Sequence, residues 1–124
     1  MNNKRFSFLI AALIACAVLA ACGGGGGGGG TSALDVTLKG EDIKFDTTSL
    51  TATVGQTVNV TLQNAGVLEH SFIVDELNVR IEKVPAGQTG TASFTPSSAG
   101  TYTYYCDVPG HKEAGMTGTL TVNP

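Results

Sequence analysis

The chain has few cysteines, histidines and basic residues, and each shortage excludes a class of protein. Its 124 residues include three cysteines, two histidines and no tryptophan. Seven basic residues stand against ten acidic ones, which argues against a nucleic-acid partner. No apolar run reaches the roughly 20 residues that a membrane-spanning helix requires. A chain of this length is expected to hold one small domain.

The amino-terminal segment has the pattern of a secretory signal. Lys4 and Arg5 are positively charged, and residues 6–21 form a run of apolar and small residues interrupted only by Ser7. A positive start, a short apolar core and a small-residue end are typical of a signal peptide. A membrane anchor helix that stays in place is the alternative. We therefore predict that residues 1–21 are a signal.

The end of this signal, Leu19-Ala20-Ala21-Cys22, resembles the lipobox of bacterial lipoproteins. The resemblance implies that Cys22 becomes the first mature residue and carries lipid, and several acyl chains give stable anchoring. An ordinary cleavage site beside a chance cysteine is the alternative. Eight glycines follow at residues 23–30, a composition typical of a flexible tether. The predicted organisation is a signal at 1–21, a lipidated linker at 22–30 and a domain at 31–124, held outside the cytoplasm on the periplasmic or cell-surface side of a bacterial membrane.

The predicted domain is acidic and holds a single cysteine. It contains five of the basic residues and all ten acidic ones, which gives a net charge of −5. Cys16 lies in the signal and Cys22 at its end, so Cys106 alone remains and no disulfide can form within the domain. A lone thiol in an oxidising compartment needs an explanation. Metal binding supplies one.

The sequence pattern of the domain predicts an all-β fold. Apolar and polar residues alternate with a period of two in Val- and Thr-rich segments, which are separated by turn residues. The alternation slips at Lys83, and residues 75–78 are too few to assign as a helix. Seven or eight short strands predict an antiparallel sandwich or a Greek-key barrel. The predicted strands are 34–39, 57–63, 70–74, 79–84, 89–94, 101–106 and 117–122.

Three potential metal ligands fall within eleven residues near the carboxyl end. The segment reads CDVPGHKEAGM and contains Cys106, His111 and Met116, while His70 opens a predicted strand upstream. Two imidazoles, a thiolate and a weak thioether are the ligand set of a type 1 copper site. Each residue alone has an ordinary structural alternative, in the core or on the surface. All four in this order predict one copper ion that cycles between Cu(I) and Cu(II).

Two stretches around these residues resemble the cupredoxins. They are Asn64-Ala65-Gly66 with His70-Ser71-Phe72, and residues 100–122 around Cys106. The C-x4-H-x4-M loop is similar to that of auracyanins and rusticyanins. The resemblance covers essentially all of residues 31–124. It implies a cupredoxin-like Greek-key β-sandwich or barrel, with His70, Cys106 and His111 as equatorial ligands and Met116 as the axial ligand.

Neighbours of the ligands are predicted to shape the site. Asn64 precedes the loop that leads to His70, and Gly110 lies in the loop whose backbone N–H groups can reach the Cys106 sulfur. Many cupredoxins have Asn after the first histidine, where it ties the ligand loops together. This chain has Ser71 there, which has less reach. The backbone carbonyl of Glu69 is a candidate for a further axial ligand.

Apolar or small residues near the ligands form a candidate docking patch for a redox partner. Simple loop packing is the equally weighted alternative. Tyr105 should point away from the core if Cys106 points inward, and it resembles the remote electron port of plastocyanins; a plain surface tyrosine is its alternative. The patch residues are Val67, Leu68, Val108, Pro109, Ala114 and Gly115.

These features predict a monomeric one-electron carrier with transient redox partners and no small-molecule substrate. The domain lacks the extra histidines of a multicopper enzyme, because Asp107, not histidine, follows Cys106. A binuclear copper centre would need a second cysteine in this loop. A copper carrier or store in metal handling is the alternative, although the domain's single methionine disfavours it. An adhesive sandwich would leave the ligand pattern unexplained.

Overall fold

The computed structural model describes residues 30–124, which form nine β-strands and one short 3-10 helix. The predicted signal, Cys22 and residues up to 29 lie outside the described residues. All seven predicted strands are present, and two more, β2 and β3, were not predicted. The elements are β1 Leu34–Glu41, β2 Lys44–Phe45, β3 Ser49–Thr53, β4 Val58–Asn64, β5 His70–Val74, η1 Asp75–Leu77, β6 Val79–Val84, β7 Thr89–Phe94, β8 Gly100–Tyr105 and β9 Thr117–Asn123.

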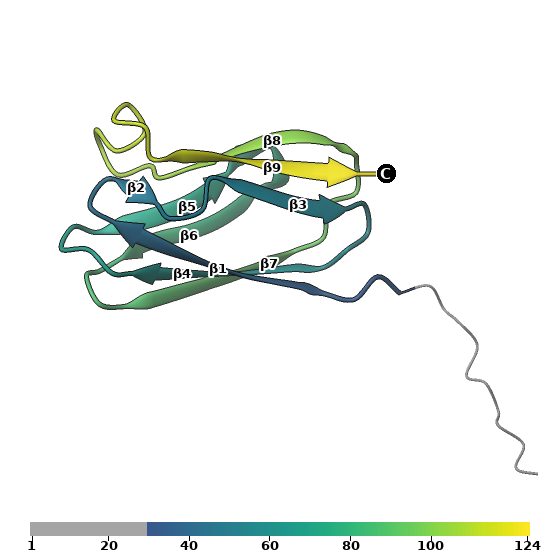
Figure 1. The fold of residues 1–124 in the computed structure, drawn as a ribbon, viewed down its shortest axis with the longest axis horizontal. Coiled ribbons are helices and arrows are strands. Elements are labelled where there is room, and N and C mark those ends of the chain that lie inside the picture. Colours follow the sequence, from purple (N-terminus) through teal and green to yellow (C-terminus); the bar gives the residue numbers. More distant parts are fainter. Residues whose placement is uncertain (1–29) are drawn as a thin grey trace, which may run out of the picture.

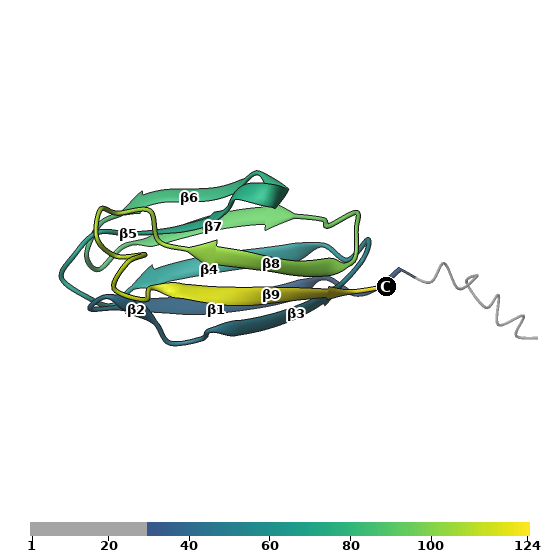
Figure 2. The same cartoon turned by 90° about the horizontal axis from the view of Figure 1, so that it is seen from above.

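The strands form two sheets that pack face to face as a sandwich (Figures 1 and 2). One sheet has the order β2-β1-β4-β7 and the other β3-β9-β8-β5-β6. Both sheets are mixed, since β1 runs parallel to β4 and β3 parallel to β9. The antiparallel expectation was therefore wrong for these two pairs. Alternation of side chains is the same in both kinds of ladder, so the pattern cannot distinguish them.

The core lies between the sheets, where alternate side chains of each strand point inward. In β4 the inward positions are Val58, Val60 and Leu62, all fully buried. The rings of Phe45, Phe72 and Tyr104 pack together, with centroids 5.1–6.3 Å apart. Such contacts stabilise a core beyond the area they bury. The all-β prediction is confirmed.

A bulge explains why the alternation slips in β6. His70 pairs with Val84 but Phe72 pairs with Ile81, so β6 has one more residue than β5 across this interval. Lys83 lies in the interval with a left-handed φ of 45°. An extra residue on one strand is the definition of a β-bulge, and it bends the strand. The bulge falls opposite the start of β5, where His70 lies.

The loops that carry the predicted ligands lie together at one end of the sandwich (Figure 1). These loops are 64–70, between β4 and β5, and 106–116, between β8 and β9. The chain enters β1 from the opposite end, where β9 also finishes (Figures 1 and 2). Residues 30–124 contain no helix that is long and apolar enough to cross a membrane.

Candidate metal centre

Three of the four predicted ligands meet in the interior at the loop-bearing end. His70 is the first residue of β5, Cys106 follows the last residue of β8, and His111 lies on the loop before β9. The metal-binding atoms of the three side chains lie within 4.8 Å of one another. His70 and Cys106 are fully buried and His111 is 6% exposed. Residues 36 positions apart in the sequence thus converge on one small volume.

His70 has no internal hydrogen-bond partner. Both ring nitrogens are buried without a hydrogen-bond partner. Among the described residues, no other buried side-chain nitrogen or oxygen lacks one. Burial and the nearby His111 lower the pKa of His70, while Asp42 acts in the opposite direction. A neutral imidazole offers one donor and one acceptor, and leaving both unpaired in the interior is costly. A metal ion that accepts the lone pair of one His70 ring nitrogen would relieve the cost for that nitrogen.

Two glycines make room for the His70 ring. A Cβ on Gly40 would fall 2.7 Å from the His70 Cδ2 atom, and a Cβ on Gly66 would fall 3.3 Å from Nε2. Gly40 lies near the end of β1, and Gly66 in the loop before β5. Backbone therefore packs directly against the imidazole edge. This close packing fixes the orientation of a side chain that no hydrogen bond holds.

The Cys106 sulfur accepts a backbone hydrogen bond from the neighbouring strand β5 and lies close to His111. The Ser71 backbone N–H donates to Cys106 Sγ over 3.3 Å, and His111 Nδ1 lies 3.4 Å from the same sulfur. Cys106 is a free thiol. A backbone donor aimed at the sulfur stabilises a thiolate and tunes a metal bound to it. This arrangement suits a Cys ligand better than a buried apolar cysteine.

The ligand loop 106–116 is closed by its own backbone. Cys106 N–H donates to the Met116 carbonyl over 3.1 Å, and Met116 N–H donates to the His111 carbonyl over 2.9 Å. Tyr105 pairs with Thr117 at the end of the β8–β9 ladder, so Cys106 and Met116 continue its register. Met116 is fully buried in the core cluster. The hairpin thus brings the first and last residues of the loop face to face.

Asn64 organises the loop that ends at His70. Its side-chain amide donates to the carbonyls of Leu68 and Val84, and its oxygen accepts the Gly66 N–H. The residue is buried, with 3% of its surface exposed. Its three hydrogen bonds fix the shape of the loop that leads to His70. Gly110 lies in the other loop with a left-handed φ of 86°, and the role of the Glu69 carbonyl stays a prediction.

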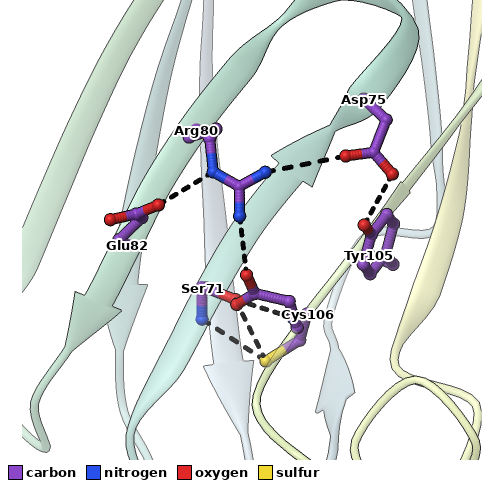
Figure 3. Close-up of polar contacts among 7 residues, drawn as sticks. Ser71, Asp75, Arg80, Glu82, Tyr105 and Cys106 are labelled. Atoms are coloured by element: carbon purple, nitrogen blue, oxygen red, sulfur yellow. Dashed lines mark hydrogen bonds and ion pairs between the residues drawn. The ribbon is translucent and has the colours of Figure 1, made fainter.

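A polar network runs from Cys106 to the surface (Figure 3). The Ser71 hydroxyl contacts the Cys106 sulfur at 3.6 Å and Asp107 Oδ1 at 2.5 Å, and it accepts the Asp107 backbone N–H. Arg80 then pairs with Asp107, Asp75 and Glu82. Ser71 therefore does connect the two ligand loops, as the asparagine of the family does. Sequence reasoning singled out neither Arg80 nor the role of the Asp107 side chain.

Tyr105 joins this network through Asp75 (Figure 3). Its side chain is partly exposed while Cys106 is buried, as the alternation predicted. Its hydroxyl donates to Asp75 over 2.6 Å, a bond that raises the pKa of Tyr105. The Lys112 ammonium lies 3.8 Å from the ring centroid, within cation–π range. Tyr105 is thus an ordered surface residue one peptide away from the predicted thiolate.

The exposed apolar residues gather at the same end of the molecule. Among the described residues, the large hydrophobic side chains that are exposed are Val67 at 84%, Leu68 at 44% and Ile43 at 38%. Ile43 lies in the β1–β2 turn and was not predicted to belong to the patch. The sequence signal that could have identified it is an apolar residue inside the turn Glu41–Lys44. A Cβ on Gly66 would lie 3.0 Å from the Asp42 backbone nitrogen, so this turn adjoins the 64–70 loop. The other predicted patch residues also reach the surface: Val108, Pro109, Ala114 and Gly115.

Comparison with known proteins assigns the family. The profile of the cupredoxin-like domain matches residues 9–122. The chain belongs to the cupredoxin-like family. It is 34% identical over 120 residues to auracyanin-A of Chloroflexus aurantiacus, covering 73% of this chain and 74% of that protein. It is 32% identical over 108 residues to the plastocyanin of Solanum tuberosum, covering 73% of this chain and all of the relative.

A solved cupredoxin structure shares the fold. Auracyanin A from Chloroflexus aurantiacus, described as a "blue" copper protein, superposes with a TM-score of 0.67 and 27% identity. The match covers 75% of this chain and all of the other. The cupredoxin fold predicted from the sequence is confirmed. In this cupredoxin the unpaired His70 nitrogens and the hydrogen-bonded Cys106 sulfur form a donor set that fits copper.

Proposed function

We propose that this cupredoxin is a one-electron carrier with a single mononuclear type 1 copper site. The observation that carries the proposal is the buried convergence of His70, Cys106 and His111, whose metal-binding atoms lie within 4.8 Å of one another. A thiolate and two imidazoles in the interior suit both Cu(I) and Cu(II). The similarity to auracyanin-A and to plastocyanin supports the same assignment. The protein acts as a carrier and not as an enzyme.

The ligand roles follow from the chemistry of the donors. His70, Cys106 and His111 are the proposed equatorial ligands, and the buried Met116 is the proposed weak axial ligand. When bound, copper supplies the one-electron couple. The protein supplies fixed positions: glycine backbone packs against His70, the β8–β9 ladder holds Cys106 and Met116, and the loop hydrogen bonds hold His111. Ligands that cannot move keep the reorganisation small during electron transfer.

The copper proposal is tested by adding Cu(II) to the metal-free full chain in mild detergent. We expect an intense visible band that saturates at one copper per chain, with a narrow hyperfine splitting in the EPR spectrum. The Cys106→Ser variant should lose the band. A weak band with ordinary copper EPR would contradict a trigonal thiolate site. It would favour copper handling instead, a function suggested by the name of a 28% identical relative, the copper-resistant cuproprotein CopI of Rubrivivax gelatinosus.

We further propose that the protein is a lipid-anchored monomer outside the cytoplasm. The support is the sequence at residues 1–30: a signal at 1–21, the lipobox cysteine Cys22 and a glycine linker up to residue 30, followed by the domain at 31–124. Cys22→Ser is expected to abolish incorporation of labelled palmitate and to release the protein from the membrane fraction. Full membrane retention of Cys22→Ser would contradict the anchor. Elution of the detergent-solubilised chain as a dimer would contradict the monomer.

The apolar patch formed by Ile43, Val67 and Leu68 is proposed to contact transient redox partners. It lies at the loop-bearing end, and the opposite end receives the chain from the proposed tether (Figure 1). Electron self-exchange between two copies provides a test without a known partner, because it requires the same approach to the site. Val67→Asp should slow self-exchange several-fold. Thr51→Asp, the same charge on an exposed position of β3, should leave it nearly unchanged; equal slowing by both would refute the patch.

A further inference from the structure

The Ser71 hydroxyl has one proton and two acceptors that compete for it. One acceptor is Asp107 Oδ1 at 2.5 Å, and the other is the Cys106 sulfur at 3.6 Å. A distance of 2.5–2.7 Å is typical of an O–H bond to a carboxylate, which is among the strongest protein hydrogen bonds. The hydroxyl oxygen also accepts the Asp107 backbone N–H at 2.8 Å, which orients it toward that residue. The proton therefore goes to Asp107, and the sulfur keeps the Ser71 backbone N–H as its donor at 3.3 Å.

Arg80 holds the Asp107 carboxylate in the position that captures this proton. Its Nη2 donates to Asp107 Oδ2 over 2.8 Å, which leaves Oδ1 for Ser71. Arg80 is held in turn by Glu82 at 2.8 Å and by Asp75 at 3.6 Å (Figure 3). A guanidinium has a rigid fork of donors, so contacts on several sides fix its plane. The side chain of Asp107 is thereby locked between β6 and the site.

We propose that Asp107, positioned by Arg80, withholds the Ser71 hydroxyl proton from the Cys106 sulfur and so lowers the reduction potential of the site. This inference rests on the copper site proposed above. Asp107 and Arg80 are positioning residues, since neither offers a ligand atom. Ser71 is the residue through which they act. Because a carboxylate only accepts hydrogen bonds, Asp107 takes the Ser71 proton and donates none in return.

The direction of the effect follows from charge. The reduced site carries one more negative charge than the oxidised site, so a hydrogen bond donated to the sulfur stabilises the reduced form more. Withholding a donor therefore lowers the potential. The negative charge of Asp107 acts in the same direction by favouring the oxidised form. Two effects of one side chain must be separated by experiment.

Asp107→Asn releases the hydroxyl without removing the bond to Arg80. An amide has a single oxygen, and Arg80, which only donates, would take it. The amide NH2 would then face Ser71 and donate to its oxygen, which frees the hydroxyl proton for the sulfur. Asp107→Ala removes both functions and releases the hydroxyl as well. Glu82→Gln is the matched control: it removes one negative charge beside Arg80, its amide oxygen can still accept the Arg80 Nε–H, and Glu82 makes no hydrogen bond to Ser71, Cys106 or Asp107.

The experiment measures the reduction potential and the thiolate-to-copper absorption band of the full chain. Asp107→Asn should shift the equilibrium toward the reduced form by roughly tenfold, about 59 mV for one electron, and move the band to higher energy. Ser71→Ala alone should change the equilibrium less than about twofold, because the hydroxyl does not serve the sulfur in the native protein. Combined with Ser71→Ala, Asp107→Asn should lose most of its effect. Glu82→Gln should resemble the native protein.

Three outcomes would overturn the inference. The first is an equal shift by Asp107→Asn with and without the Ser71 hydroxyl, which would leave only a charge effect. The second is a large drop in potential for Ser71→Ala alone, which would show that the hydroxyl already donates to the sulfur. The third is a native potential in both Asp107 variants. Urea unfolding of each metal-free variant verifies that it is folded. Absence of the visible band in the native protein would instead refute the copper site itself.

Discussion

The unpaired nitrogens of His70 predict that this ligand destabilises the metal-free protein. Both nitrogens are buried without a partner, and each unsatisfied polar group costs about 1–3 kcal/mol. Replacing histidine with leucine removes both groups at similar size, against a repacking cost of up to about 1.5 kcal/mol. We expect metal-free His70→Leu to be more stable than the metal-free native protein by about 0.5–6 kcal/mol. The variant should also lose the visible copper band.

Thermal and urea unfolding of the metal-free proteins measure this effect. For a domain of this size, 1 kcal/mol corresponds to a change in Tm of about 4–8 °C, so the smallest expected gain is well resolved. His111→Leu is the matched control: the same chemical change removes an imidazole that contacts the Cys106 sulfur and retains some exposure. It should bring a smaller gain or a loss. In copper-loaded samples the order should reverse, because binding stabilises the native protein alone.

A clear result would refute this reasoning. If metal-free His70→Leu is no more stable than the native protein, while the native protein binds copper as proposed, then the His70 nitrogens are satisfied in solution, for example by water. An equal gain in both histidine variants would show that general apolar substitution, and not the unpaired state of His70, is responsible.

Three further predictions concern residues that support the core and the site. Burial raises the pKa of Tyr104 to about 12. The stability that the neutral phenol contributes is therefore present below pH 10 and is lost as the pH rises through 12, a fall in unfolding free energy of about 2–3 kcal/mol. Urea unfolding of Tyr104→Phe across this pH range should lack that loss. Gly118→Ala would place a Cβ in steric overlap with the Tyr104 ring, so its unfolding free energy should fall by at least about 1–3 kcal/mol, while Thr119→Ala at the exposed neighbour should change little. Gly40→Ala would press on the His70 ring and should weaken copper affinity by about 10–100-fold, measured by competition with a chelator; unchanged affinity would mean that the ring has room to move.

Most of the fold could be predicted because alternation of side chains reports a buried face directly. The two strands that were missed have simple explanations. β2 has two residues, too few for a period of two to be visible, and β3 has two buried positions, Leu50 and Ala52. The parallel pairing of β1 with β4 could not be predicted, since it depends on which sheet each strand joins. The slip at Lys83 was visible in the sequence, and the register shift shows that it is a bulge.

The ligand cluster could be predicted because the loop is short and its ends are held by one hairpin. The spacing of Cys106, His111 and Met116 has a physical meaning only if the two flanking strands pair, and they do, from Gly100 with Val122 to Tyr105 with Thr117. His70 comes from another strand, β5, which touches β8 through the pair Ile73 and Tyr105. That contact spans more than thirty residues. The residue types along the chain do not predict this contact. The resemblance to the cupredoxins was what linked His70 to the loop that carries the other ligands.

The substitution of asparagine by Ser71 shows where reasoning from one position fails. A serine has less reach than an asparagine, and the sequence alone predicts a looser connection between the ligand loops. The structure has the connection, because Asp107 extends from the other loop to meet Ser71, and Arg80 fixes Asp107 in place. The shorter reach of Ser71 is offset by the Asp107 side chain, which extends from the other loop to meet it. The connection has a chemical consequence, because the Asp107 carboxylate draws the Ser71 hydroxyl proton away from the Cys106 sulfur. The same geometry can therefore hold the ligand loops together while giving the metal a different electrostatic environment, and that environment is the part of the site that a ligand pattern cannot encode.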